Sequence, residues 1–196
     1  MKIIGLTGPT GSGKSTVAKL LQEKGFAAID CDLVAREVVE KSSPLLEILC
    51  EAFGSDILLS DGSLDRKTLA KKAFCDDEST ELLNSIMLPF IAERIKEQLM
   101  LLADDGIEVA LLDAPTLFES GLDSECDAVI AVLCDRETRK QRIIKRDKLT
   151  DEQAEIRLKA SKPDSFYIGR TKHIVFGDGT ADETGSVVGK ILEEIL

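Results

Sequence analysis

The sequence has no hydrophobic run long enough to cross a bilayer, no surplus of basic residues and no closely paired cysteines. A membrane-spanning helix needs about 18 consecutive apolar residues, and no run in the 196-residue chain approaches that length. We therefore expect no membrane segment. The formal net charge of −11 disfavours a broad nucleic-acid-binding surface, although it allows a local basic pocket for a small phosphate compound.

The cysteine pattern excludes two further kinds of site. The five cysteines are far apart in the sequence and include no C-x-x-C pair. This pattern gives neither a zinc site nor a disulfide framework, and it predicts reduced thiols. The N-terminal stretch MKIIGLTGPTG lacks the longer apolar core of a signal peptide. Together these features predict a cytoplasmic protein.

Short apolar runs alternate with helical patterns along the chain. Strands are expected at residues 2–7, 26–30, 107–115, 127–135 and 173–179. The helical block at about 33–103, with a break expected at Pro89, is too long for a simple crossover between parallel strands. The sequence predicts an α/β fold in which a doubly wound, five-stranded parallel sheet carries an inserted helical domain.

One glycine-rich stretch, GPTGSGKS at residues 8–15, fits the pattern G-x-x-x-x-G-K-[ST]. Glycines let backbone N–H groups converge on phosphate oxygens, and the following helix adds the partial positive charge of its N-terminus. A glycine-rich turn followed by a chance Lys-Ser is the alternative, but the flanking strand and helix disfavour it. We predict an ATP site formed by Gly8, Gly11, Ser12, Gly13, Lys14, Ser15 and Thr16.

A basic cluster at residues 136–146 stands out in this acidic chain. Arg142 and Arg146 are four residues apart and so share one helical face. On a lid they could bind ATP phosphates and neutralise charge on the transferring phosphoryl group. A solvated helix with i,i+4 ion pairs explains the composition equally well. Because the chain also lacks a G-protein Asn-Lys-x-Asp motif, a small-molecule kinase is favoured over a GTPase.

Asp30 ends the predicted strand at 26–30, and Asp32 follows two residues later. If the strand continued past Asp30, its period of two would place Asp30 and Asp32 on one face. The ends of parallel strands are where ligands bind, so Asp32 is a candidate base or metal ligand, and a solvated turn is the alternative. Asp113, which ends another apolar run, could act beside magnesium through water or serve only as a strand-end cap.

The chain resembles the dephospho-coenzyme A kinase family over nearly its full length. The segments that carry this resemblance are GLTGPTGSGKSTVAKLLQEKG, AIDCDLVAREVV, DGSLDRKTLAKKAF, LLDAPTLFESGL and RDKLTDEQAEIRLKAS. The family transfers the γ-phosphate of ATP to the ribose 3′-hydroxyl of dephospho-coenzyme A. The resemblance therefore implies ATP and Mg²⁺, and a P-loop kinase core formed by residues 1–32, 104–136 and 169–196. It also implies a helical acceptor domain at residues 33–103 and a lid at residues 137–168.

Residue roles follow from the same resemblance. Asp32 matches the family's general base and would act with Lys14 and Arg142 in catalysis. Acceptor contacts are implied for Asp32, Arg36, Arg66, Pro115 and Glu119, and metal contacts for Ser15 and Asp113.

Three positions depart from the family pattern. Leu88 replaces a histidine, Ser161 a glutamine and Gly177 an asparagine near the nucleotide base. These changes bear on adenine contacts and acceptor fit more than on phosphoryl transfer. They leave two alternatives open: a nucleoside or nucleotide kinase, and a nucleotide-binding regulatory protein with reduced transfer. A monomer or weak homo-oligomer with a small-molecule acceptor is expected.

Overall fold

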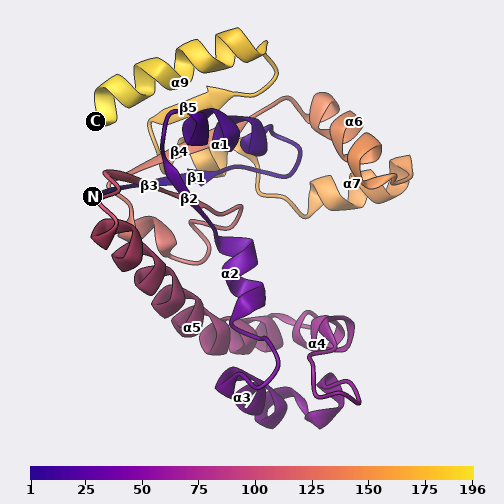
Figure 1. The fold of residues 1–196 in the computed structure, drawn as a ribbon. Coiled ribbons are helices and arrows are strands. Elements are labelled where there is room, and N and C mark those ends of the chain that lie inside the picture. Colours follow the sequence, from indigo (N-terminus) through magenta and orange to yellow (C-terminus); the bar gives the residue numbers. More distant parts are fainter. The chain divides into compact units, whose positions relative to one another are not determined.

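The computed structural model describes residues 1–196, which form two compact units. One unit consists of residues 1–28 and 105–196, and the other of residues 29–104. Both are drawn in Figure 1, where the first holds the sheet and the second is helical. Each unit has a hydrophobic core of its own.

A five-stranded sheet in the order β2-β3-β1-β4-β5 forms the centre of the first unit. Its strands are β1 (Lys2–Thr7), β2 (Ala27–Asp30), β3 (Val109–Asp113), β4 (Ala128–Leu133) and β5 (His173–Phe176), and β2 runs on into the second unit. β1 pairs in parallel with both β3 and β4, and β4 pairs in parallel with β5. The first strand therefore lies in the middle, and its carboxyl end adjoins those of β3 and β4.

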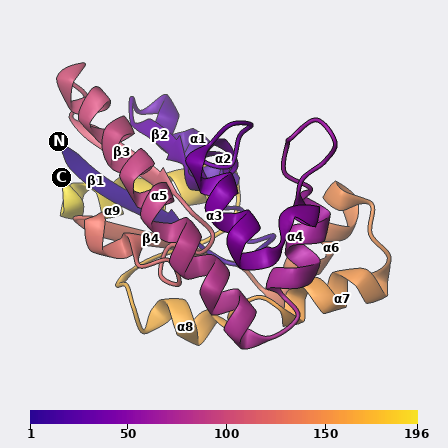
Figure 2. The same cartoon turned by 90° about the horizontal axis from the view of Figure 1, so that it is seen from below.

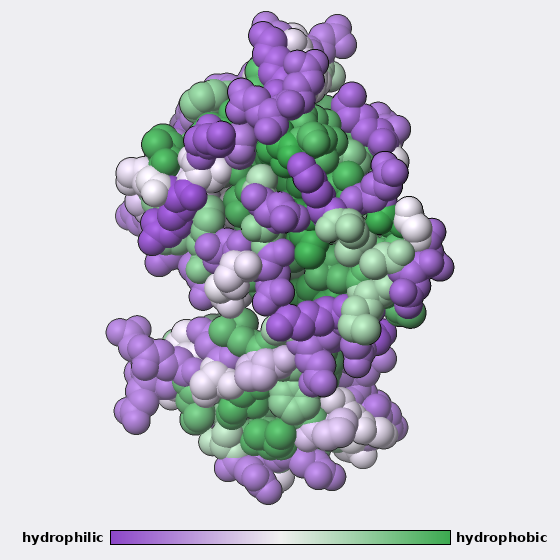
Figure 3. Space-filling view, turned by 90° about the vertical axis from the view of Figure 1, so that its left-hand side faces the viewer, coloured by the Kyte–Doolittle hydropathy of each residue, from purple (hydrophilic) through white to green (hydrophobic).

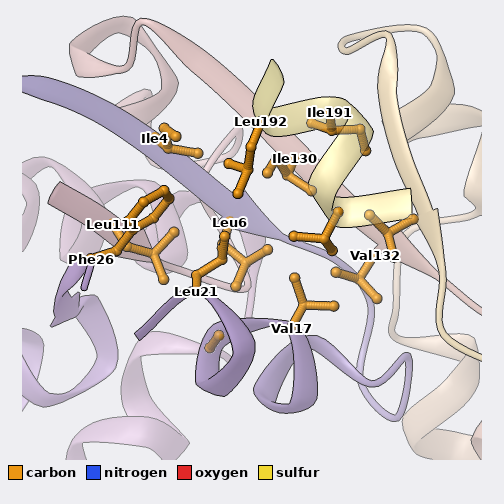
Figure 4. Packing of buried hydrophobic residues seen from close by; sticks show 13 residues of the cluster. Ile4, Leu6, Val17, Leu21, Phe26, Leu111, Ile130, Val132, Ile191 and Leu192 are labelled. Carbon is orange, nitrogen blue, oxygen red and sulfur yellow. The ribbon is translucent and has the colours of Figure 1, made fainter. Parts of the chain in front are cut away.

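Helices cover both faces of this sheet. On one face lie α1 (Lys14–Glu23) and α9 (Ala181–Ile195). Their side chains Val17, Leu21, Ile191 and Leu192 pack against strand residues such as Ile130, as Figure 4 shows. On the other face, α8 (Asp164–Ile168) packs its Tyr167 against β4. The prediction of a doubly wound parallel sheet is confirmed.

The charged region after β4 folds into two helices that pack on each other. These are α6 (Arg136–Asp147) and α7 (Asp151–Lys159), joined by a short loop. Thr150 and Gln153 form a capping box at the start of α7, which satisfies backbone N–H groups that have no partner within the helix. The short η2 (Leu122–Glu125) precedes β4.

The second unit is helical apart from the end of β2 and one isolated bridge between Leu58 and Leu64. Its elements are α2 (Cys31–Glu37), α3 (Pro44–Phe53), η1 (Ser55–Ile57), α4 (Arg66–Ala73) and α5 (Asp77–Asp104). Figure 2 shows α3 and α4 against one half of α5, and the apolar residues they share include Leu49, Leu69 and Met87. α3 ends at Gly54, which has φ +93° after the last helical residue.

The break predicted at Pro89 is wrong, because α5 continues through this residue. Proline removes one backbone hydrogen bond and crowds the preceding turn. Pro89 is exposed, so water can replace that bond, while the neighbours Ile86, Met87 and Phe90 pack into the core of the second unit. Packing on both sides of the proline therefore holds the helix together.

The surface mixes polar and apolar residues. Figure 3 shows green hydrophobic areas among purple ones, and large apolar side chains such as Phe74 and Ile156 are exposed. None of the helices has the length and apolar character needed to cross a membrane.

Candidate active site

The loop between β1 and α1 is built so that only glycine fits at two of its positions. Gly8 has φ +148°, and a Cβ there would lie 2.2 Å from the carbonyl oxygen of Val132 in β4. Gly11 has φ +80°, and its Cβ would lie 2.8 Å from the carbonyl oxygen of Arg139 in α6. Close contact with two neighbouring backbones therefore explains these glycines, beyond their positive φ.

The loop ends at the positive end of a helix. Gly13, with φ +99°, is the N-cap of α1, and Lys14 is its first residue. Ser15 and Thr16 are exposed on the first turn, as a phosphate and magnesium site requires. Ser12 differs, because the residue is 1% exposed and its hydroxyl has no hydrogen-bond partner. Any contact of Ser12 with ATP must therefore come from its backbone.

Lys14 and Asp113 form an ion pair at the ends of α1 and β3. The two side chains are 18% and 20% exposed, so the pair is only partly screened by water. This contact brings together the predicted phosphate-binding lysine and one of the predicted metal-side residues. No group of three or more His, Cys, Asp or Glu side chains forms a metal cage. A cation beside Ser15 and Asp113 would thus depend on phosphate oxygens and water, as Mg²⁺ commonly does.

Arg142 lies against the loop, with its guanidinium bound to backbone carbonyls. One nitrogen donates to the Gly11 carbonyl oxygen at 3.3 Å and another to that of Gly177 at 2.7 Å. Arg146, predicted on the same face, instead forms two hydrogen bonds with Asp147, at 2.8 Å and 2.9 Å. The two arginines share a helix but have separate partners.

A pocket adjoins Arg142 and the start of α1. It is lined by Gly13, Thr16, Val17, Arg142, Gly177, Gly179, Ala181 and Thr184. The α9 residues Ala181 and Thr184 were not predicted from the sequence, where the glycine pair between β5 and α9 was the available signal. At Gly177 a Cβ would lie 2.1 Å from the Ser12 carbonyl oxygen, so in this chain the loop has no room for a side chain there.

Asp30 and Asp32 do not share a strand face, because β2 ends at Asp30. Asp30 is the N-cap of α2, and its carboxylate accepts a hydrogen bond from the Leu33 N–H at 3.0 Å. Capping by an aspartate ends the strand at once and starts a helix. Asp32 is therefore exposed in the first turn of α2 and not at a strand end.

The other predicted acceptor residues fall into two groups. In the second unit, Arg66 at the start of α4 donates to the Arg36 carbonyl oxygen at 3.1 Å, so these residues lie together. In the first unit, Pro115 and Glu119 follow β3, and Glu119 is exposed.

Burial, helped by the charge of Glu119, raises the pKa of Tyr167 to about 12. Tyr167 is therefore a neutral phenol throughout the physiological range.

Chemically, the first unit offers backbone N–H groups, a helix N-terminus and a lysine for phosphate groups, together with a serine and an aspartate for a cation. The second unit offers the exposed carboxylate of Asp32, with Arg36 on the same helix and Arg66 at the start of α4. This is the inventory of a phosphoryl transferase whose acceptor is a small molecule.

Comparisons with known proteins agree with this inventory. The profile of the family described as Dephospho-CoA kinase matches residues 2–183. A dephospho-CoA kinase from Corynebacterium glutamicum is 44% identical over 193 residues, which cover 98% of this chain and 96% of the relative.

Solved structures extend the likeness to the fold. A crystal structure of a Thermus thermophilus protein superposes with a TM-score of 0.83 at 28% identity, covering 100% of this chain and 98% of the other. A dephospho-CoA kinase from Campylobacter jejuni has a TM-score of 0.68 at 26% identity, with coverage of 100% and 98%.

Proposed function

The chain belongs to the dephospho-CoA kinase family, and from this premise we propose that it transfers the γ-phosphate of ATP to the ribose 3′-hydroxyl of dephospho-CoA. The products are coenzyme A and ADP. The family match over residues 2–183 is the observation that carries the proposal. The phosphate loop between β1 and α1 supports it with the matching chemistry.

ATP binds with its phosphates at the loop and the start of α1 in this proposal. The backbone from Gly8 to Gly13 and the side chains of Lys14 and Thr16 hold the β- and γ-phosphates, and Arg142 and Arg146 add positive charge from α6. The nucleoside lies in the pocket beside Gly177. Ser15 and Asp113 would hold Mg²⁺, which would supply positive charge to the phosphate groups.

Asp32 acts as the general base. Its carboxylate takes the proton of the 3′-hydroxyl while the hydroxyl oxygen bonds to the γ-phosphorus. The bond from that phosphorus to the β,γ-bridging oxygen breaks, and ADP leaves. Lys14 and Arg142 stabilise the charge that spreads over the transferring group.

The remaining roles are also proposals. Residues 33–103 form the acceptor domain, where Arg36 and Arg66 contact the substrate, and residues 137–168 form the lid. Pro115 and Glu119 contact the acceptor from the segment after β3. A monomeric or weakly associated state, a cytoplasmic location and the lack of a nucleic-acid or membrane partner stay predictions from the sequence.

Acceptor turnover tests the activity directly. The protein is incubated with Mg-ATP and, separately, dephospho-CoA, AMP, CMP, deoxynucleosides or pantothenate, and ADP formation is measured. We expect turnover with dephospho-CoA well above every other acceptor. Turnover of a nucleotide in its place would favour the nucleotide kinase alternative, and ATP binding without any turnover would favour a regulatory protein.

The role of Asp32 has a matched control two residues away. Asp32→Asn should lower kcat by roughly 10²- to 10⁴-fold, the usual contribution of a general base, while the Kd for ATP stays the same. Asp30→Asn should leave kcat nearly unchanged, because asparagine is also a good N-cap. If the Asp32 variant kept full activity, the carboxylate would have no part in proton transfer.

A further inference from the structure

Arg139 on α6 is a buried cation attached to the phosphate loop. Arg139 is 6% exposed, and its Nε donates to the Thr10 carbonyl oxygen at 3.0 Å. One of its terminal nitrogens lies 3.8 Å from the Asp164 carboxylate at the start of α8. Arg136, one turn earlier, is exposed and pairs with Glu155 in α7. The side chain of Arg139 is thus the one of these two that faces the loop.

Burial lowers the pKa of Arg139, and the charge of Asp164 partly opposes that effect. The guanidinium nevertheless stays protonated, because arginine does not lose its proton in proteins. Burying a charge costs desolvation free energy, which an apolar side chain of similar length would not lose. This cost makes a purely space-filling role a poor explanation of the arginine.

The hydrogen bond from Arg139 fixes the orientation of one peptide group. The Thr10 carbonyl and the Gly11 N–H belong to the same peptide, which is trans, since the chain has no cis peptide bonds. In a trans peptide these two groups point in opposite directions. With its carbonyl bound to Arg139, the peptide turns the Gly11 N–H away from α6. No group of the protein accepts a hydrogen bond from this N–H.

Close backbone contact reinforces that orientation. The missing Cβ of Gly11 would lie 2.8 Å from the Arg139 carbonyl oxygen and 3.2 Å from its Cα. The loop therefore rests on the backbone of the residue whose side chain holds the Thr10 carbonyl.

We propose that Arg139 is a positioning residue for the phosphate groups: by holding the Thr10 carbonyl from behind the loop, it aims the Gly11 N–H at the nucleotide's phosphates. Arg139 itself touches no phosphate. The inference rests on the proposed function, because it assigns the loop to a nucleoside di- or triphosphate. It also explains why a cation lies buried on the side of the loop that faces α6.

Replacement by methionine separates positioning from folding. Arg139→Met keeps a long apolar side chain, and the Asp164 carboxylate that loses its partner is 47% exposed and can be solvated by water. We expect its Kd for Mg-ADP, measured by calorimetry, to rise roughly tenfold or more, as for loss of a hydrogen bond from a charged donor. The Kd for adenosine, measured by NMR titration, should stay within about twofold, because adenosine has no phosphate. Arg136→Met is the control on the same helix and should change neither constant.

Several results would overturn the inference. These are wild-type affinity of Arg139→Met for Mg-ADP, equal loss of ADP and adenosine binding, or an Arg136→Met variant with the same loss of ADP binding. If Arg139→Met does not fold, Arg139→Lys decides. Lysine keeps a charge and one donor, so an intermediate loss of ADP affinity with unchanged adenosine binding supports positioning, and wild-type ADP affinity contradicts it.

Failure of the proposed function would look different. A wild-type protein that binds Mg-ADP but does not phosphorylate dephospho-CoA would refute the activity without bearing on Arg139.

Discussion

A side chain at Gly177 should loosen the nucleotide site, because the β5–α9 loop packs against the phosphate loop at this point. A Cβ on Gly177 would lie 2.1 Å from the Ser12 carbonyl oxygen and 3.3 Å from a methyl carbon of Val132. Carbon and carbonyl oxygen meet in proteins at about 3.3–3.6 Å. Since the nearest neighbour is backbone, one of the two loops must move.

The expected loss of stability in Gly177→Ala follows from these contacts. Forcing a methyl group into a packed site costs about 1–3 kcal/mol, and any movement also weakens the 2.7 Å hydrogen bond from Arg142 to the Gly177 carbonyl oxygen. Replacing glycine by alanine also makes the unfolded chain less flexible, which offsets about 0.4–1 kcal/mol of this loss of stability. For a chain of this size, each kcal/mol corresponds to about 2–4 °C in Tm. We therefore expect a fall of several degrees, together with weaker binding of Mg-ADP.

Gly189 supplies a control, because the same replacement there should raise stability. It lies inside α9, and a Cβ there would meet nothing within 4 Å. Gly189→Ala should stabilise the protein by about 0.5–1 kcal/mol, because glycine is the poorer helix former. Thermal unfolding followed by circular dichroism, with calorimetry for Mg-ADP, measures both variants. The reasoning is refuted if Gly177→Ala unfolds at or above the wild-type temperature and binds Mg-ADP normally.

Two further predictions concern ion pairs. Asp113→Asn removes the partner of Lys14 and should raise the Mg²⁺ concentration for half-maximal activity by roughly 10- to 100-fold, whereas an unchanged Mg²⁺ titration would leave Asp113 without a metal role. A hydrogen bond from Arg136, and to a smaller extent one from Lys140, lowers the pKa of Glu155 to about 2. Because the pKa of this carboxyl is lowered on folding, its ionised form stabilises the fold at pH values above its ordinary pKa of 4.5. This contribution is lost as the pH falls from 4.5 toward about 2. Over that range, Tm should fall less steeply in Glu155→Gln than in the wild type, and parallel curves would contradict the prediction.

The parts of the fold that depend on local sequence could be predicted. Apolar runs identified every strand of the sheet. Asp65 is an aspartate just before a helix, where this residue type is common, and its carboxylate accepts hydrogen bonds from the Lys67 and Thr68 N–H groups. Gly25, with φ +93°, follows the end of α1, where glycine is common. In each case the physical cause lies within a few residues of the feature.

Predictions failed where a local rule met a competing contact. The geometry of proline favoured a break at Pro89, but packing of its neighbours in the second unit keeps α5 continuous. The period-two pattern of a strand would have reached Asp32, but capping by Asp30 starts α2 first. Asp30 illustrates the difficulty, since an aspartate after an apolar run can continue a turn, bind a ligand or cap a helix. Only the Leu33 N–H at 3.0 Å decides among these.

The arrangement around the phosphate loop was beyond sequence reasoning because its contacts join distant segments. Spacing on α6 placed Arg142 and Arg146 on one face, yet Arg142 binds carbonyls of Gly11 and Gly177, which lie 131 and 35 residues away in the sequence. A family pattern alone made Gly177 look like a lost polar contact with the base. The Ser12 carbonyl 2.1 Å from the position of its missing Cβ gives a steric reason for the glycine. A substitution that looks like a functional loss in the sequence can therefore be what allows two loops of the nucleotide site to pack together.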